Sequence, residues 1–203
     1  DTATYRAVEA AWQRNGAGYW GAKDDQPPDV DFCPRPDVKA VVLRPKDFGK
    51  SGDPNNNSVV VRVDYGEDSF LFVGDTEDEE EKLLTSDPST RALLDVDFLK
   101  AGHHGSNTSS TDAFLNLVTP QIVAVSCGAK DVSTNAGYKH PRLERIQALL
   151  SHAGARRGPA VTMEAFDTAG GTWKSVTLNK AVYVTTAEGD LVFESDGHGI
   201  RKR

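Results

Sequence analysis

Short apolar runs alternate with segments of helical pattern through most of this chain. The runs with the length and composition of strands span residues 38–43, 58–65, 69–74, 96–101 and 122–126. Helix patterns or helix end signals mark residues 76–84 and 111–118, and a further helix is expected to begin at His140-Pro141 and end at Gly154. Because strands and helices alternate, the pattern predicts an α/β fold.

Two of these segments carry more specific expectations. In the run over residues 58–65, Val59, Val61 and Val63 would share one face of a strand, and residues 65–68 have the composition of a hairpin turn. The helix expected at residues 76–84 opens with an acidic run over residues 77–81, as the helix dipole favours. We interpret that acidic run as a solvated helix start.

The two ends of the chain differ from its middle. Residues 4–14 have a helical pattern, and residues 15–37 are rich in Gly, Pro and Asp, which predicts a loop or linker. Short strand-like runs at 160–166, 172–178, 181–186 and 191–194 predict an antiparallel finish, followed by a frayed basic tail. We therefore divide the chain into residues 1–37, 38–197 and 198–203.

Composition excludes several classes of protein. The net charge is −7 and the pI is near 5.2, which argues against binding nucleic acid by bulk attraction alone. The chain has two cysteines, too few for a disulfide framework, and no apolar run of the ~20 residues that span a bilayer. A single cytoplasmic domain is expected, and because the chain begins at Asp1 without methionine we expect it to be part of a longer polypeptide.

Polar residues follow two of the predicted strands at the point where each ends. Asp75 ends the apolar run over residues 69–74, and His103 and His104 follow the run over residues 96–101. In an extended segment these two imidazoles would point to opposite faces, unless the turn at Gly105 brings both inward. A carboxylate at the end of an apolar strand must be solvated, paired with a cation or bound to a metal ion. One interpretation of Asp75 and the two histidines is therefore a metal site.

His140 is a third candidate ligand, placed just before a predicted helix N-terminus, which also suits an anion. Aspartate and imidazole are ligands that Zn²⁺ and Mn²⁺ accept, and one carboxylate can bridge two ions. Five cations lie near these residues in sequence, as phosphate contacts or as ordinary solubilising surface: Lys100, Lys130, Lys139, Arg142 and Arg145.

Five ordered motifs together resemble the metallo-β-lactamase fold, and more narrowly its ComEC-type branch, known from domains of DNA-uptake proteins. They are Asn-Asn-Asn-Ser-Val-Val-Val at 55–61, Phe-Leu-Phe-Val-Gly-Asp at 70–75, Leu-Lys-Ala-Gly-His-His-Gly-Ser at 99–106, Ser-Cys-Gly at 126–128 and Tyr-Lys-His-Pro at 138–141. The resemblance covers roughly residues 38–197. It implies a four-layered αββα sandwich with a metal site at the rim between two sheets.

The resemblance also implies roles for individual residues. Asp75 matches the bridging aspartate of a two-zinc centre, His103 or His104 matches a histidine ligand, and His140 would be a ligand or a phosphate contact. The residues expected to approach the substrate are Asn57, Ser58, Ser106 and Asn107. By this resemblance the catalytic residues are Asp75, His103 and His140.

One departure from the family pattern concerns the first half of the sandwich. The family's His-x-His-x-Asp-His cluster should precede this segment, yet residues 1–54 contain no histidine. The site then needs a complementary N-terminal half, present as another chain or as a further stretch of the same polypeptide. Proteolysis before Asp1 or within residues 15–37 would separate the two halves. Three functions follow: a metal-dependent nuclease or other phosphodiesterase acting on single- or double-stranded DNA, a hydrolase of small esters or lactones, and a non-catalytic or protease-regulated module.

Overall fold

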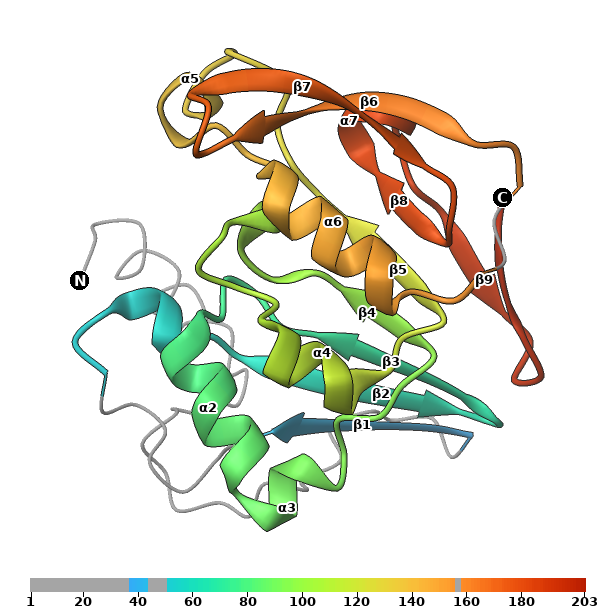
Figure 1. The fold of residues 1–203 in the computed structure, drawn as a ribbon. Coiled ribbons are helices and arrows are strands. Elements are labelled where there is room, and N and C mark those ends of the chain that lie inside the picture. The colour runs from blue at the N-terminus through green and yellow to red at the C-terminus, as the bar shows by residue number, and fades with distance from the viewer. Residues whose placement is uncertain (1–36, 44–50, 156–157) are drawn as a thin grey trace, which may run out of the picture.

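A computed structural model describes residues 37–43, 51–155 and 158–203, and its main element is a six-stranded sheet (Figure 1). In spatial order its strands are β1 (Val38–Leu43), β2 (Val60–Tyr65), β3 (Asp68–Phe72), β4 (Phe98–Lys100), β5 (Ile122–Val125) and β8 (Val182–Val184). The first three strands pair antiparallel, and β3, β4, β5 and β8 pair parallel. The predicted helix over residues 4–14 and nearly all of the loop after it lie outside the described residues.

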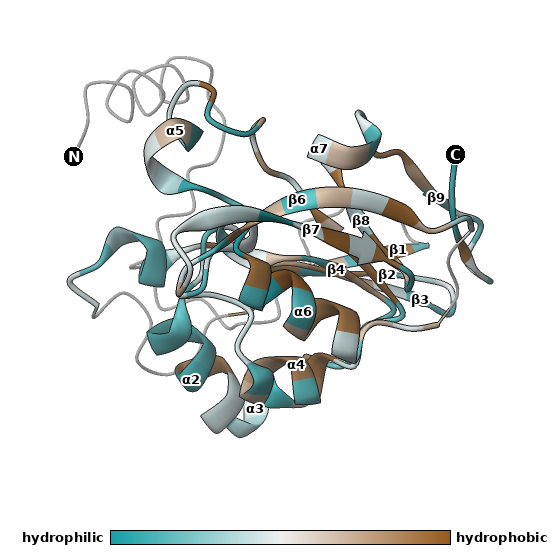
Figure 2. Cartoon of the chain, turned by 45° about the horizontal axis from the view of Figure 1, so that its top comes forward, coloured by the Kyte–Doolittle hydropathy of each residue, from teal (hydrophilic) through white to brown (hydrophobic). Residues whose placement is uncertain are grey.

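The helices α2 (Asp78–Ser86), α4 (Asp112–Val118) and α6 (Leu143–His152) lie on one face of this sheet (Figures 1 and 2). Shorter helical segments are η1 (Pro54–Asn57), α3 (Pro88–Arg91), η2 (Gly102–Gly105), α5 (Asn135–Tyr138) and α7 (Thr185–Glu188). Two strand pairs complete the described part, β6 (Val161–Asp167) with β7 (Thr172–Leu178) and β9 (Phe193–Ser195) with β10 (Ile200–Lys202). This arrangement confirms the predicted α/β class.

The hydrophobic core lies between the sheet and the helices. Leu71, Leu99 and Val123 occupy paired positions on β3, β4 and β5 and are fully buried. Phe114 of α4 and Leu149 of α6 belong to the same buried cluster. Both helices thus pack apolar residues into the core, and brown stretches mark α4 and α6 in Figure 2.

The opposite face of the sheet carries aromatic side chains. Phe70 and Phe72 of β3 alternate with the buried Leu71, and each lies near Phe98, with ring centroids 5.6 and 6.2 Å apart. Phe193 of β9 covers part of this face, at 4.9 Å from the Phe98 ring. Phe72 is 40% exposed, so part of this apolar face is open to solvent.

Several local predictions are wrong. Val59, expected to share a strand face with Val61 and Val63, lies one residue before β2 and is 57% exposed. The strand begins at Val60, which is fully buried and pairs with Leu43. β8 joins the main sheet parallel to β5, so the chain does not finish in a purely antiparallel unit. Pro141 lies two residues before α6, and the tail expected to fray contributes β10, where Lys202 binds Glu188 at 2.7 Å.

Candidate metal centre

The candidate centre lies at the carboxyl ends of β3 and β4. These strands run parallel and are neighbours, so the segments that follow them, with Asp75 and the His103-His104 pair, leave from the same edge of the sheet. His103 donates its backbone N–H to the carbonyl of Gly74 at 3.2 Å, which ties the two segments together. The backbone N–H of Arg142 bonds Gly105 at 2.9 Å and brings the segment containing His140 alongside.

The two histidines lie in a tight turn, η2, and not in an extended segment. His103 has φ 41° and His104 has φ 54°, both in the left-handed region that non-glycine residues seldom adopt. Their ring centroids are 6.2 Å apart. Of the two arrangements open from the sequence, the turn therefore brings both imidazoles toward the same edge, each beside a carboxylate.

His104 faces Asp75. Its Nε2 lies 3.4 Å from Asp75 Oδ1, and its Nδ1 lies 2.7 Å from the carbonyl oxygen of Ser126, to which only a protonated Nδ1 can donate. That bond leaves Nε2 to face Asp75, where a metal ion could take the place of a proton. Both side chains are more than 40% exposed, so a ligand from solvent can reach them.

His103 faces Glu77, a residue that we did not select from the sequence. His103 Nδ1 lies 2.7 Å from Glu77 Oε1, and the Thr108 hydroxyl donates to the same oxygen at 2.7 Å. The Glu77 side chain is 12% exposed and that of His103 is 18% exposed, so this pair is largely withdrawn from water. Glu77 is part of the acidic run over residues 77–81, which was the only sign of it in the sequence. Its partners His103 and Thr108 lie 26 and 31 residues further along the chain.

His140 completes the group of imidazoles. Its ring centroid is 5.4 Å from that of His103, and Tyr138 stacks on it at 6.0 Å with an interplanar angle of 9°. Burial, together with the nearby charges of His103 and Arg142, lowers the pKa of His140 to about 4. The ring is therefore neutral at physiological pH, and its buried Nδ1 has no hydrogen-bond partner among the residues that the structure describes.

These side chains fit part of a metal site. Two ligands of a tetrahedral zinc ion, each about 2.0–2.1 Å from the metal, lie roughly 3.3 Å apart, and the His104–Asp75 separation of 3.4 Å matches that spacing. Within the part of the chain that the structure describes, however, no group of three or more His, Cys, Asp or Glu residues is arranged to hold an ion. Asp75 and His104 thus form an incomplete ligand set.

The four predicted substrate contacts have partners within the protein. Ser58 accepts the backbone N–H of Asp75 at 3.1 Å, and Asn57 donates to backbone carbonyls of residues 51 and 53. Ser106 is buried and bonds the Thr108 hydroxyl at 2.9 Å, while Asn107 donates to Thr168 at 2.9 Å. These bonds hold the loops around Asp75 and the histidine turn.

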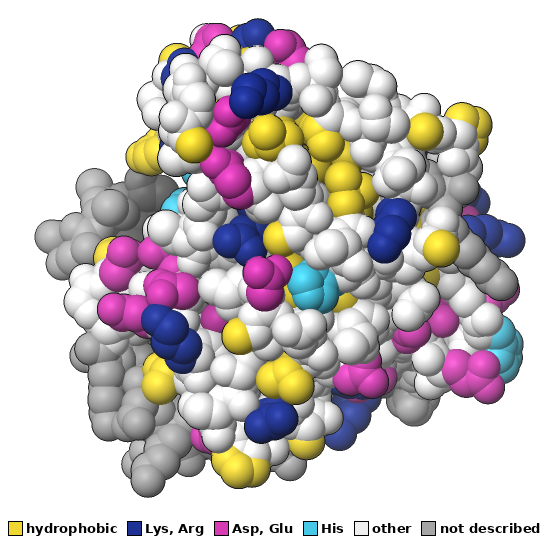
Figure 3. All heavy atoms as spheres, in the orientation of Figure 1, with side chains coloured by type: hydrophobic (Ala, Val, Ile, Leu, Met, Phe, Trp, Pro, Cys, Tyr) yellow, Lys and Arg dark blue, Asp and Glu magenta, His cyan; other side chains and the backbone are white. Residues whose placement is uncertain are grey.

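The start of α2 is not a solvated acidic turn, because Glu80 and Glu81 are buried. Glu80 accepts the backbone N–H of Ser58 at 3.2 Å and the Thr76 hydroxyl at 3.0 Å. Glu81 accepts the backbone N–H of Thr111 at 2.8 Å and that of Ser110. These two carboxylates therefore connect α2 to the loops on either side of the centre. On the molecular surface, acidic side chains gather on the left of Figure 3.

Glu80 should make stability depend on pH. Burial raises its pKa from 4.5 to about 7, so the folded state favours the protonated form. The stabilisation is complete below pH 4.5 and is lost as the pH rises through 7, a loss of about 3 kcal/mol. In Glu80→Gln this contribution to the pH dependence of the unfolding free energy should vanish. Urea unfolding at pH 5 and pH 8 measures it, and Glu79→Gln, at an exposed position, is the control. An unchanged pH dependence in Glu80→Gln would contradict the assignment.

The five cations near the centre all have partners of their own. Lys130 binds Glu164 at 2.9 Å, and Lys100 donates to the carbonyl of Gly74 at 3.3 Å. The remaining contacts are those of Lys139 with Asp131, Arg142 with the carbonyl of Tyr138, and Arg145 with the carbonyls of Asn107 and Ser110. Their contribution to binding a polyanion stays a prediction.

Comparison with known families identifies the class of protein. The family model described as "Metallo-beta-lactamase superfamily" matches residues 3–129, more than half of the chain. The chain belongs to the metallo-β-lactamase superfamily. The mixed sheet and its helical layer agree with this membership, and zinc is the metal that this superfamily generally binds.

Curated relatives place this metallo-β-lactamase superfamily member in the ComEC-type branch. It is 36% identical over 121 residues to "Recombination protein 2" of Haemophilus influenzae, which covers 60% of this chain and 14% of that protein. It is 38% identical over 99 residues to "Competence protein ComA" of Neisseria gonorrhoeae, a match that covers 49% of this chain and 13% of that protein. It is 32% identical over 121 residues to "ComE operon protein 3" of Bacillus subtilis, a match that covers 58% of this chain and 14% of that protein. The chain spans about one seventh of the length of these relatives.

Proposed function

We propose that this chain supplies one side of the metal centre of a phosphodiesterase that cleaves DNA. The observation that carries the proposal is the pairing of His104 Nε2 with Asp75 Oδ1 at 3.4 Å, together with the bond that fixes His104 Nδ1 on Ser126. A histidine whose second nitrogen bonds a backbone carbonyl is the usual form of a metal ligand. Superfamily membership supports a metal-dependent hydrolase.

In this proposal Asp75 and His104 bind metal, while His103 and His140 lie beside them as neighbouring ligands or phosphate contacts. Bound divalent ions would lower the pKa of a coordinated water and offset the charge of a phosphodiester. Glu77 holds the His103 ring through Nδ1, so that Nε2 is free to face the site. His140, neutral because of its lowered pKa, can accept a hydrogen bond at Nδ1, for which the described part of the chain supplies no partner.

The remaining ligands would come from a complementary segment that carries the His-x-His-x-Asp-His motif. The described residues hold no complete ligand set, which is why a second contribution is needed. The exposed apolar face around Phe72 offers a place where a second sheet would pack, as in the four-layered sandwich. We propose that this segment covers that face and closes the centre from the opposite side.

DNA is the substrate that the relatives favour. The names of two of them refer to recombination and to competence, and these two are 36% and 38% identical to the matched part of this chain. Among the described residues there is no helix long and apolar enough to cross a membrane. The proposed reaction is therefore hydrolysis of a DNA phosphodiester at a site formed by the sheet edge and the complementary segment.

The test of this function is hydrolysis by the chain assembled with its complementary segment. We expect Zn²⁺- or Mn²⁺-dependent cleavage of single-stranded DNA, and turnover of small esters or lactones that is slower. Faster turnover of esters would favour the second hydrolase class. No turnover of either substrate, with the complementary segment bound, would favour a non-catalytic module, a function that the incomplete ligand set also allows.

Glu77 gives a more specific prediction. Glu77→Gln keeps the size of the side chain but removes the charge beside His103 Nδ1, which weakens the hold on that ring. We expect activity or metal affinity to fall roughly 10–100-fold, the usual effect of losing such a supporting group. Glu79→Gln, on the exposed side of the same segment, should leave both unchanged. Equal activity of Glu77→Gln and the parent protein would contradict this role.

A further inference from the structure

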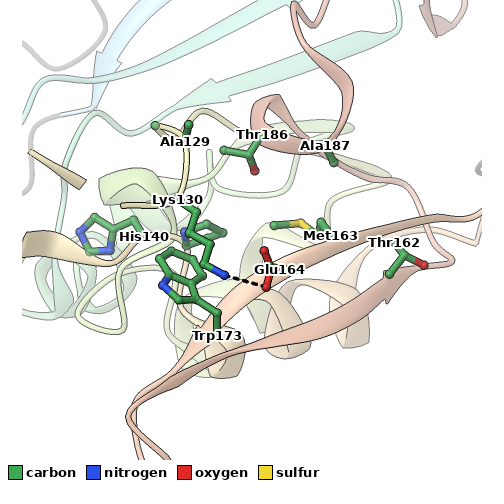
Figure 4. A pocket seen from close by; sticks show the side chains of 11 residues that line it. Ala129, Lys130, His140, Thr162, Met163, Glu164, Trp173, Thr186 and Ala187 are labelled. Atoms are coloured by element: carbon green, nitrogen blue, oxygen red, sulfur yellow. Dashed lines mark hydrogen bonds and ion pairs between the residues drawn. The ribbon is translucent and has the colours of Figure 1, made fainter. Parts of the chain in front are cut away.

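A pocket with a volume of about 240 Å³ adjoins the candidate centre (Figure 4). Its lining includes Ala129 and Lys130 from the loop after β5, Met163 and Glu164 from β6, Trp173 from β7, and His140. Figure 4 shows His140 at one end of the pocket and Thr162 at the other. The pocket thus begins at a residue of the imidazole group and is lined by residues of both β6 and β7.

Trp173 forms a held aromatic wall in this pocket. Its ring packs edge to face against Phe166, with centroids 5.5 Å apart. The residue is only partly buried, so some of the ring surface stays available to a ligand. A fixed, partly exposed indole is well suited to stack on a planar ring.

A hydrogen-bond donor and an acceptor lie side by side next to that wall. Lys130 Nζ is 5.6 Å from the Trp173 ring centroid and 2.9 Å from Glu164 Oε1. Both side chains of this ion pair are at least 40% exposed, and an exposed pair of this kind separates at little cost. An adjacent ammonium and carboxylate match the adjacent acceptors and donors at the edge of a nucleobase.

We propose that this pocket binds the base of a nucleotide whose phosphate lies at the metal centre. The proposal rests on the proposed function and assigns its substrate a second point of attachment. Trp173 stacks on the base, and Lys130 and Glu164 contact its polar edge. His140, whose ring is 5.4 Å from His103, connects the base pocket to the imidazole group. Recognition then depends on a base beside the cleaved phosphodiester, and not on backbone charge alone.

The test is a binding measurement on the chain assembled with its complementary segment. The probes are the four deoxynucleoside 5′-monophosphates and, as a base-free control, deoxyribose 5-phosphate. Indole N–H signals in NMR spectra report binding, and Trp173→Phe identifies the Trp173 signal among the three tryptophans. We expect the nucleotides to shift the Trp173 signal and the base-free sugar phosphate to leave it unchanged. Equal effects of both probes would overturn the proposal.

Variants test the individual contacts. Trp173→Ala should weaken nucleotide binding about tenfold, in line with the loss of one stacked base, and Glu164→Gln should change the order of preference among the four bases. Lys82→Ala, on the exposed surface of α2, should have no effect. If Trp173→Ala unfolds the protein, Lys130→Ala replaces it, because that side chain is exposed. Unchanged affinity in folded Trp173→Ala, or in Lys130→Ala and Glu164→Gln together, would overturn the proposal.

The two proposals fail in different ways. Base binding without any hydrolysis of DNA would refute the proposed function but leave the pocket assignment standing. Metal-dependent hydrolysis with the same KM for DNA in Trp173→Ala would refute the base pocket but leave the proposed function standing.

Discussion

Asp75→Ala should lower the rate of DNA hydrolysis about 10³-fold while the protein stays folded. Metal-bound stabilisation of a phosphodiester transition state contributes several kcal/mol, and each 1.36 kcal/mol changes a rate tenfold. The side chain is 41% exposed and lies near the His104 ring, so its removal leaves no cavity in the core. Rates measured under saturating metal, alongside thermal unfolding of each variant, would check both parts.

The matched control for this substitution is Asp78→Asn. Asp78 lies three residues along the chain and pairs with the exposed Lys82, away from the imidazole group. We expect its activity to stay within about fivefold of the parent protein, since changes at such exposed pairs are worth under about 1 kcal/mol. Retained hydrolysis in Asp75→Ala would remove Asp75 from the centre.

The largest effect on stability is expected at Phe114. Its side chain is fully buried between α4 and the sheet, in the cluster that contains Leu71 and Leu99. Replacing a buried phenylalanine by alanine removes its transfer free energy and leaves a cavity, so Phe114→Ala should lower the free energy of unfolding by about 3–5 kcal/mol. Urea unfolding at a fixed pH measures this change.

Phe72→Ala is the informative comparison for Phe114→Ala. Phe72 lies on the opposite face of the sheet and is 40% exposed, so its replacement should cost the isolated chain less than Phe114→Ala does. It should instead weaken association with the complementary segment, because Phe72 lies on the face proposed to bind it. Equal losses of stability in the two variants would contradict the description of the core.

Local sequence patterns predicted most strands of the fold. The run over residues 38–43 is β1, and the turn at Gly66 joins β2 to β3 as expected. The helix expected at residues 111–118 is α4, where the Thr111 side chain accepts the backbone N–H of Phe114 at the N-terminus. Alternating hydrophobicity and end signals act over a few residues, so one sequence is enough to read them.

Features that depend on distant partners were not predictable in this way. Glu80 and Glu81 are buried because Ser58, Ser110 and Thr111 donate to them from other segments, and the acidic run contains no trace of those partners. β8 pairs with β5 through residues that lie 59 positions apart in sequence, such as Val123 and Val182, a contact that only the closed sheet specifies.

The candidate centre was predicted in its residues but not in its pairings. The sequence pointed to Asp75 and to both adjacent histidines, and the structure places His104 beside Asp75 and His103 beside Glu77. The left-handed backbone at His103 and His104 decides which histidine faces which carboxylate. An extended segment, which the sequence suggested, would not predict this pairing. Glu77 was hidden because an acidic residue at a helix start has an ordinary electrostatic explanation.

We propose that this chain holds one side of a divided metal centre. Elemental analysis of the chain purified with its complementary segment tests it most directly. We expect bound zinc or manganese in the parent protein, and a marked loss of that metal when Asp75 and His104 are both replaced by alanine. Metal content that is unchanged by the double substitution, or absent from the parent protein, would contradict the claim.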